Sequence, residues 1–285
     1  MAKDEPLKKI YGLIGYPVKH SYSPAMHNAA FNALKINAEY KLFELKPEEL
    51  EGFLRSLEQN KICGLNVTVP YKEKVLDFVE IAPQSFFVKE IKAVNTIVVY
   101  KGRLEGSNTD IQGFKKALEE NINPTDKRVA VLGAGGAARA VAYVLARSLV
   151  KDIHIYDIDK TKSRNIINMI KKIIPSCQIS SVDSIEELEV KNKDLLINAT
   201  PIGLSEKDPC LIKEEMLHKD LFVYDLIYNP AETKLLALAK KNGLRFSNGL
   251  KMLLYQGIFS FSYWTGVREP PVEVMRKALM EAMQK

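Results

Sequence analysis

A glycine-rich turn near the middle of this 285-residue chain constrains the fold more than any other feature. Val129–Leu132 is a short apolar run typical of a buried parallel strand. Gly133, Gly135 and Ala138 follow it at the three small-residue positions of the G-x-G-x-x-G/A pattern. Ala137–Leu149 is then rich in residues that favour a helix. A strand, a tight turn and a helix in this order predict a nucleotide-binding unit.

The small residues of the turn have separate physical roles. Gly133 makes the tight turn, Gly135 lets a pyrophosphate approach the backbone, and Ala138 packs the helix on the strand. Free N–H groups and the dipole at the helix N-terminus favour an anion. An ordinary glycine turn is the alternative, but a second strand, Ile153–Tyr156, ends in Asp157 at about the 20-residue spacing of a ribose-binding carboxylate. The predicted cofactor-binding residues of this turn and strand are Gly133, Ala134, Gly135, Gly136, Ala137 and Asp157.

Composition excludes several other classes of protein. The chain is 46% hydrophobic and 27% charged, which is ordinary for a globular protein. Its net charge of +6 comes from scattered lysines with no basic stripe between aromatic residues, so no nucleic-acid partner is expected. The first residues have no apolar signal sequence, and the longest apolar run, Met252–Trp264, is too short to span a membrane.

The cysteines point to a reducing compartment. Cys63, Cys177 and Cys210 have no C-x-x-C spacing and no nearby histidine cluster. Neither a disulfide framework nor a metal site is therefore expected, and we predict a cytoplasmic location.

Hydrophobic patterns predict an α/β protein of two domains. Residues 1–110 are predicted to form a mixed α/β substrate-binding domain, with a helix that starts at Pro24 and is capped by Ser23. Residues 111–249 alternate strands and helices as in a Rossmann dinucleotide-binding domain, and Leu195–Ala199 is predicted to be its third parallel strand. Residues 250–285 predict two helices, and the residues alone do not say which domain these helices pack on.

Polar side chains follow several of the predicted strands, where open α/β sheets bind their ligands. Lys72 and Asp110 are the best pair to exchange a proton with a reacting hydroxyl, since none of the four histidines is well placed by a motif. Each has a plain alternative, because Lys72 suits a solvated helix start and Asp110 suits a helix N-cap.

Other polar residues suit a substrate but are weaker candidates. Ser21, Ser23 and Tyr228 could hold a carboxylate, although the serines could equally be loop hydroxyls and a cap. Gln256 is more polar than its apolar helix requires, yet it could be a satisfied core amide. Asn66, Thr68 and Asn95 complete the strand-end clusters.

In combination these residues resemble one family closely. The segments that carry the resemblance run in order along nearly the whole chain: Gly15–Pro24, Gly64–Lys72, Ala93–Thr96, Gly106–Asp110, Gly133–Ala137, Asn198–Pro201, Asp225–Pro230, and Asn248–Leu253 with Gln256. They are similar to the motifs of shikimate dehydrogenases. The Asn-Val-Thr-x-Pro-x-Lys and Asn-Thr-Asp motifs are specific when they occur together.

The resemblance implies reversible oxidation of the shikimate 3-hydroxyl to 3-dehydroshikimate. It implies that Lys72 transfers the proton and that Asp110 is its partner and holds substrate hydroxyls. It also implies that the final helices return to the first domain and that the two domains close on a cleft. The remaining implied roles are substrate carboxylate binding by Ser21, Ser23 and Tyr228, ring-hydroxyl binding by Asn66, Thr68, Asn95 and Gln256, and contact of Leu226 and Gly249 with the nicotinamide half of the cofactor.

The chain departs from the family pattern at one place. Most members that use NADP carry Asn-Arg-Thr after the second strand of the cofactor domain, whereas this chain has Asp157-Ile-Asp159. Asp157 would accept hydrogen bonds from a free ribose 2′-hydroxyl and repel a 2′-phosphate, so we favour NAD over NADP. Lys160, Lys162 and Arg164 keep NADP open, since a flexible lysine could reach the phosphate.

Two questions remain: which acid is the substrate, and whether the chain is an enzyme or a non-catalytic binding protein. Both serines of the Ser-x-Ser motif are present, which favours shikimate, with quinate as a side substrate or as the substrate of a catabolic enzyme. A non-catalytic dinucleotide sensor is the rival from another class, but it would not need Lys72 or Asp110. The oligomeric state is left open, with a homodimer as one option.

Overall fold

The computed structural model describes residues 7–284, and the chain divides into two compact units. The first unit contains the residues up to Gly113 together with those from Leu253 onward. The second, Phe114–Met252, is inserted between them and is called the inserted unit below. The chain passes from one unit to the other within two helices, α4 (Asp110–Glu119) and α8 (Leu250–Thr265).

The first unit is built on a mixed sheet with strand order β2-β1-β3-β5-β6-β4. The neighbours β1, β2 and β3 are parallel, while β5 is antiparallel to both β3 and β6. Its strands are β1 (Lys9–Gly15), β2 (Ala38–Glu44), β3 (Ile62–Val67), β4 (Glu80–Ile81), β5 (Thr96–Tyr100) and β6 (Arg103–Ser107). Its other helices are α1 (Ser23–Ala33), α2 (Leu50–Arg55), α3 (Phe87–Ile91) and α9 (Val272–Met283), with 3-10 helices η1 (Pro47–Glu49), η2 (Lys74–Phe78) and η3 (Pro83–Ser85).

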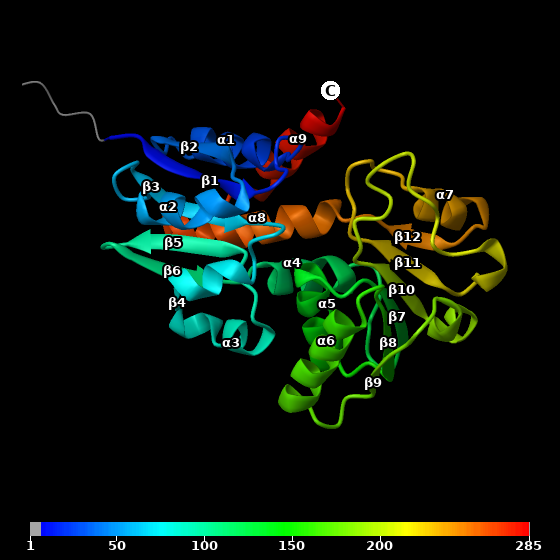
Figure 1. Cartoon of the computed structure of the whole chain (residues 1–285). Coiled ribbons are helices and arrows are strands. Elements are labelled where there is room, and N and C mark those ends of the chain that lie inside the picture. The colour runs from blue at the N-terminus through cyan, green and yellow to red at the C-terminus, as the bar shows by residue number, and fades with distance from the viewer. Residues whose placement is uncertain (1–6, 285) are drawn as a thin grey trace, which may run out of the picture. The chain divides into compact units, whose positions relative to one another are not determined.

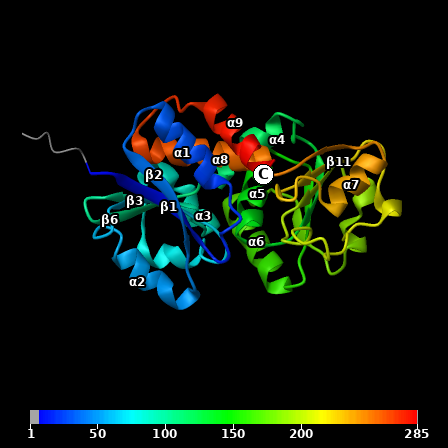
Figure 2. The ribbon, with the colours of Figure 1, turned by 90° about the horizontal axis from the view of Figure 1, so that it is seen from above.

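The two faces of this sheet bury different cores. Leu50, Leu54 and Leu57 pack against the sheet residues Ile14 and Leu65 in one cluster. The opposite face is covered by α1, α8 and α9, as Figure 2 shows. There the Trp264 ring of α8 lies 5.2 Å from the ring of Tyr11 in β1, and a side chain at Gly64 of β3 would collide with it. The final helices therefore pack on the first unit, as the family resemblance predicts.

The inserted unit is built on an all-parallel sheet with strand order β12-β11-β10-β7-β8-β9. This is the doubly wound order of dinucleotide-binding domains, and the order reverses between β7 and β10. The strands are β7 (Arg128–Leu132), β8 (Asp152–Tyr156), β9 (Ile179–Ser181), β10 (Leu195–Asn198), β11 (Phe222–Asp225) and β12 (Arg245–Ser247). The helices are α5 (Gly136–Arg147), α6 (Lys160–Ile173) and α7 (Lys234–Lys241), with 3-10 helices η4 (Glu186–Leu188), η5 (Val190–Asn192) and η6 (Glu214–Met216).

Helices cover both faces of the parallel sheet. Within this unit, α5 and α6 lie on one face and α7 on the other (Figure 1). Leu235 and Leu236 of α7 share a buried cluster with Leu132 and Leu196 of the strands. Burial on both faces explains why the central strands β7, β10 and β11 are nearly continuous apolar runs. The predicted fold class, a mixed N-terminal α/β domain plus a Rossmann domain, is confirmed.

Several local predictions are wrong. Leu195–Ala199 contains the fourth parallel strand in chain order, not the third, because β9 is short and has only one strongly apolar residue, Ile179. The helical spacing of Leu50, Phe53, Leu54 and Leu57 predicts one helix over residues 47–59, but this segment is split into η1 and α2, and α2 ends at Arg55. Ser23 is the first residue of α1 and not its N-cap, a position that Tyr22 takes without a capping side-chain bond.

Among residues 7–284, no helix is both long enough and apolar enough to cross a membrane.

Candidate active site

Lys72 lies just after β3, in a segment that is held in place by a backbone hydrogen bond and by burial of the preceding residue. Its backbone carbonyl accepts a hydrogen bond of 2.8 Å from the N–H of Val94, and the next residue back, Tyr71, is fully buried. The Lys72 side chain is only 13% exposed, and its Nζ lies 2.7 Å from Oδ2 of Asp110. A solvated lysine, the plain alternative for this residue, does not describe this geometry.

Asp110 opens α4, but its carboxylate does not cap the helix. The side chain of Asn108 caps it instead, because Oδ1 of Asn108 accepts from the backbone N–H groups of Asp110 and Ile111 at 3.0 and 3.3 Å. The Asp110 carboxylate is left for Lys72 on one oxygen and for Nδ2 of Asn95 on the other, at 2.8 Å. Both groups of the predicted catalytic pair therefore meet in a buried ion pair. Removing either partner from such a pair leaves an uncompensated charge.

Asn66 and Asn95 lie in one buried network of polar side chains. Asn66 is 4% exposed and Asn95 is 2% exposed. Nδ2 of Asn66 lies 3.3 Å from the backbone oxygen of Asn95, and Oδ1 of Asn66 accepts from the Tyr40 hydroxyl at 2.8 Å. The network continues through the hydroxyl groups of Thr96, Thr109 and Ser260. The fixed geometry means that these amides do not have to be ordered when a ligand binds.

The other predicted substrate residues of the first unit form two further groups. Ser21 and Ser23 lie together before and at the start of α1, with 3.2 Å between their hydroxyl oxygens. Thr68 follows β3, where its methyl group lies against Gly15 of β1. Gln256 is 8% exposed, and its Nε2 donates to the backbone oxygen of Leu253 at 2.8 Å. This last bond satisfies part of the Gln256 amide, as expected of a core amide, and leaves its other N–H and its oxygen available.

In the inserted unit, the glycine turn follows β7 at the point where the strand order reverses. Gly133 has φ of +95°, and a side chain there would lie 2.9 Å from the backbone of Ala199. Gly135, the N-cap of α5, faces open space, because a side chain there would meet nothing within 4 Å. The first N–H groups of a helix have no intrahelical acceptor. The loop therefore combines unused donors with room for an anion, which fits the pyrophosphate of a dinucleotide.

Asp157 connects the end of β8 to this turn. Its Oδ2 accepts from the backbone N–H of Ala134 at 2.6 Å, and its Oδ1 accepts from the N–H of Asp159 at 2.8 Å. A carboxylate oxygen has further lone pairs, so Asp157 can also accept bonds from ribose hydroxyls. The next residue, Ile158, is 91% exposed, and Asp159 caps α6 by accepting from Thr161.

The segments after β11 and β12 meet within the inserted unit. Gly249 donates its N–H to the backbone oxygen of Ile227 at 3.1 Å, and any side chain at Gly249 would overlap the backbone oxygen of Leu226. Leu226 and Gly249 are thus brought together, as their shared predicted role requires. Tyr228 is half-buried in the same segment and belongs to the inserted unit, whereas Ser21 and Ser23 belong to the first.

The carboxylate of Asp225, at the end of β11, accepts hydrogen bonds from neighbouring segments of the inserted unit. Burial raises the pKa of the Asp225 carboxyl, and hydrogen bonds from Thr233, Ile227 and Asn198 oppose that shift. Because all these donors come from the protein itself, we assign Asp225 to support of the loops after β10 and β11 and not to ligand binding.

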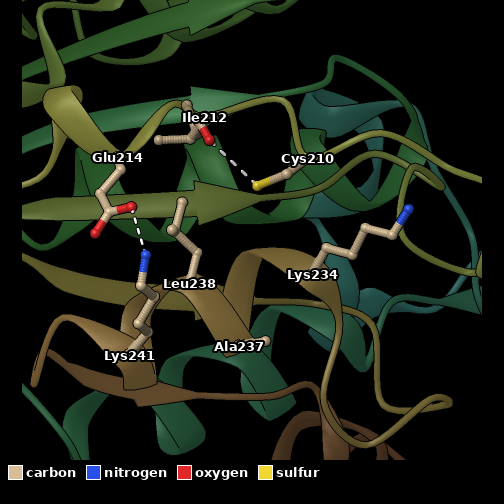
Figure 3. A pocket seen from close by; sticks show the side chains of 7 residues that line it. All are labelled: Cys210, Ile212, Glu214, Lys234, Ala237, Leu238 and Lys241. Carbon is tan, nitrogen blue, oxygen red and sulfur yellow. Dashed lines mark hydrogen bonds and ion pairs between the residues drawn. The ribbon is translucent and has the colours of Figure 1, made fainter.

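One hollow on the inserted unit lies away from the predicted site residues. A shallow cavity of about 470 Å³ lies beside α7, and Figure 3 shows its lining. None of the predicted site residues lines it. The lining residues are Cys210, Ile212, Glu214, Lys234, Ala237, Leu238 and Lys241. Within residues 7–284, no cluster of histidine, cysteine, aspartate or glutamate could hold a metal ion.

Sequence reasoning did not find four residues of the buried network: Tyr40, Thr96, Thr109 and Ser260. Ser260 carried a signal, because it follows Gln256 by one helical turn on an otherwise apolar helix. Thr96 and Thr109 lie in the motif segments Ala93–Thr96 and Gly106–Asp110, in which only Asn95 and Asp110 are predicted to be site residues. Tyr40 had no signal, since an aromatic residue in a strand is ordinary.

Comparison with known proteins agrees with this geometry. Residues 13–97 match the family model described as the shikimate dehydrogenase substrate binding domain, and residues 249–280 match the one described as the shikimate 5′-dehydrogenase C-terminal domain. A protein of Methanopyrus kandleri named shikimate dehydrogenase (NADP(+)) is 42% identical over 281 residues, covering 96% of each chain. The chain belongs to the shikimate dehydrogenase family.

Solved structures of relatives share the whole fold. A shikimate dehydrogenase in complex with NADP+ is 39% identical, with a TM-score of 0.88, over 98% of this chain and 96% of that one. The quinate dehydrogenase of Corynebacterium glutamicum in complex with NAD is 31% identical, with a TM-score of 0.86, over 96% of this chain and 99% of that one. The family thus includes structures with either dinucleotide, and NAD(P) is the cofactor class of this chain.

Proposed function

We propose that this chain is a shikimate dehydrogenase that interconverts shikimate and 3-dehydroshikimate and that uses NAD in preference to NADP. The ion pair between Lys72 and Asp110 is the observation that carries the catalytic part of this proposal. It supports an enzyme over a non-catalytic dinucleotide sensor, which would need neither charge.

Lys72 and Asp110 would act on the substrate hydroxyl that is oxidised. When bound, the nicotinamide takes or gives the hydride, and a group on the protein has to take or give the hydroxyl proton. Nζ of Lys72 is that group in our proposal. Asp110 accepts from Lys72 and from Asn95 at the same time, so it holds the lysine in one position while a substrate binds.

The remaining polar residues would bind and orient the ring. We propose that Asn66, Thr68, Asn95 and Gln256 bind ring hydroxyls. The adjacent hydroxyls of Ser21 and Ser23, with Tyr228, would bind the carboxylate. The two serines favour shikimate as the substrate. Quinate is the second candidate, favoured by the likeness to a quinate dehydrogenase in complex with NAD.

The cofactor would lie on the glycine turn, with Gly133–Ala137 on the pyrophosphate and Leu226 and Gly249 on the nicotinamide half. The NAD preference depends on Asp157. Its carboxylate is held at the turn by the N–H of Ala134, so a ribose 2′-phosphate would meet a fixed negative charge. Two like charges at about 4 Å repel by roughly 1–4 kcal/mol, or about 5-fold to 1000-fold in preference.

The nearby cations do not reverse this expectation. Lys160 pairs with Asp183 at 2.8 Å, and Lys162 lies 3.9 Å from Asp159. Exposed pairs of this kind contribute little, so both lysines stay free to turn toward a 2′-phosphate. Neither of them is fixed beside the turn, however, as the Asp157 carboxylate is.

The test is turnover of shikimate with each cofactor, followed at the absorbance band of the reduced nicotinamide. We expect the unmodified protein to favour NAD in kcat/KM. The double variant with Asp157→Asn and Ile158→Arg should favour NADP, because it removes the repelling charge and supplies a guanidinium. Asp159→Asn is the matched control, since asparagine also caps a helix, and it should keep the NAD preference.

Two outcomes would count against parts of the proposal. A large NADP preference in the unmodified protein would overturn the cofactor assignment and leave the reaction intact. Absence of shikimate and quinate turnover with both cofactors would favour the sensor. The cytoplasmic location and the homodimer stay predictions, and sedimentation of the purified chain would test the second.

A further inference from the structure

Three hydroxyl groups meet in the interior of the first unit. Thr96 of β5, Thr109 before α4 and Ser260 of α8 are each 0% exposed. Their hydroxyl oxygens lie 3.0 to 3.1 Å apart in all three pairings. The three groups come from distant parts of the chain and lie between the amides of Asn66 and Asn95. Buried polar groups at such a junction fix their neighbours when every donor and acceptor is satisfied.

The orientation of the Asn66 amide follows from its partners. One end lies 3.3 Å from the backbone oxygen of Asn95, which can only accept, so this end is the nitrogen. That nitrogen donates to Oγ of Ser260 at 2.8 Å, while Oδ1 accepts from the Tyr40 hydroxyl. Both N–H groups of Asn66 are therefore used inside the protein. What remains is a lone pair on Oδ1.

The Asn95 amide is fixed in the opposite sense. Its Oδ1 lies 2.7 Å from the backbone N–H of Thr109, which can only donate, and it also accepts from the Thr96 hydroxyl at 2.9 Å. Its nitrogen donates one N–H to the Asp110 carboxylate. The oxygen of Asn95 is fully used, and one N–H remains. Of the two amides, Asn66 can only accept a further bond and Asn95 can only donate one.

Of the three hydroxyls, Ser260 makes the shortest bond to the Asn66 nitrogen, at 2.8 Å against 3.3 Å for Thr96. Its hydroxyl donates to the backbone oxygen of Gln256 at 2.9 Å, one turn earlier on α8. With its single proton used there, Oγ has to accept from Asn66. We propose that Ser260 is a positioning residue that holds Asn66 as an acceptor for a ring hydroxyl of the substrate. This inference rests on the proposed function, because it assigns Asn66 to a polyhydroxy ring.

Ser260→Ala tests the inference, because it removes the acceptor and leaves the helix intact. Without Ser260, the Asn66 nitrogen keeps only its two longer contacts of 3.3 Å, to Asn95 and Thr96, so the amide is held less firmly in the orientation that presents its oxygen to the ligand. We expect the KM for shikimate to rise about fivefold to twentyfold, the size of one lost hydrogen bond. The kcat should change less, and the KM for the cofactor should stay within twofold.

Thr265→Val is the matched control on the same helix. The Thr265 hydroxyl donates to the oxygen of Phe261 one turn earlier, as that of Ser260 does to Gln256, but Thr265 has no contact with the network. This variant should keep the shikimate KM of the unmodified protein. Tyr40→Phe releases Asn66 from its other side and should raise the shikimate KM in the same direction. It keeps the inference testable if Ser260→Ala fails to fold.

A double-mutant cycle separates positioning from general stability. If Ser260 acts through Asn66, then Ser260→Ala should change kcat/KM for shikimate by less than twofold in an Asn66→Ala background. Additive effects would overturn the inference, as would an unchanged shikimate KM in Ser260→Ala or, if that variant does not fold, in Tyr40→Phe. In each of these cases, normal shikimate turnover by the unmodified enzyme would still support the proposed function. An unmodified protein that neither binds nor oxidises shikimate would overturn both.

Discussion

The candidate residues of the two units are held in place in different ways. In the first unit, the site consists of side chains that hold one another, and Lys72, Asp110, Asn95 and Asn66 form one connected, buried network. In the inserted unit, the site consists of bare backbone around Gly133 and Gly135, with Asp157 as its one predicted charged side chain.

This difference determines how the residues of each unit respond to substitution. A side-chain network loses function when any member changes, since each group fixes the next. A backbone loop is insensitive to side-chain chemistry but sensitive to a single added methyl group. We therefore expect large, specific losses of turnover in the first unit and steric losses of binding in the inserted unit.

The largest expected effect is that of Lys72→Met. Loss of the proton-transfer group should lower kcat by about 10² to 10⁴. The affinity for the cofactor should stay within twofold, as measured by titration of the protein with NAD. Lys74→Met, two residues on and exposed, is the control and should turn over normally. A Lys72 variant within tenfold of the normal rate would show that the network does not carry the reaction.

The two glycines of the turn should fail for different reasons. Gly133→Ala forces a side chain into φ of +95° and against Ala199, so it should lower the stability of the inserted unit by about 1–3 kcal/mol. Gly135→Ala meets open space, so its melting temperature should hold while the KM for the cofactor rises about tenfold. Thermal unfolding and cofactor kinetics check the pair. Equal losses of stability in both variants would contradict the steric argument.

The smallest expected effect concerns pH. His27 is fully buried, with its ring 4.4 Å from that of Tyr40, and neither ring nitrogen has a hydrogen-bond partner among the described residues. Burial lowers its pKa from 6.5 to about 3. The unfolded chain therefore binds a proton that the folded first unit excludes. Stability present above about pH 6.5 is lost as the pH falls, by about 2 kcal/mol between pH 7 and pH 5.

Asp225 of the inserted unit contributes to stability in the opposite way. Burial raises the pKa of Asp225, so its contribution is largest at low pH and is lost as the pH rises through the raised value. His27→Phe should flatten the acid slope of the first unit, measured by hydrogen exchange of β1 and β3. His20→Gln, at an exposed histidine, should leave the slope as it is. An unchanged slope in His27→Phe would assign the acid sensitivity to other groups.

The sequence predicted the fold class and the glycine turn because both depend on local patterns. The strand, the glycine with positive φ and the helix start lie within a few residues of one another. Local sequence patterns are therefore enough to predict their geometry. The short strand β9 was missed because three residues with one strongly apolar side chain carry no period.

The candidate site was predictable only where motifs mark it. Lys72 and Asp110 are predicted as a pair from their places after strands, family motifs support this pairing, and Nζ of Lys72 lies 2.7 Å from Oδ2 of Asp110. The hydroxyl of Ser260 lies 194 positions along the chain from the Asn66 amide that it contacts, and no local rule spans that separation. Which side chains complete a buried network depends on how distant elements pack, and sequence periodicity does not encode this.

The insertion of one unit into the other has a consequence for synthesis. The aromatic core around Tyr11, His27 and Phe31 is completed by Phe261 and Trp264 of α8, which the ribosome makes more than 200 residues later. The last strand of the inserted unit, β12, ends at Ser247, so all strands of that unit are synthesised before Phe261. The inserted unit can therefore fold while the N-terminal segment of the nascent chain still lacks the α8 residues that complete its core.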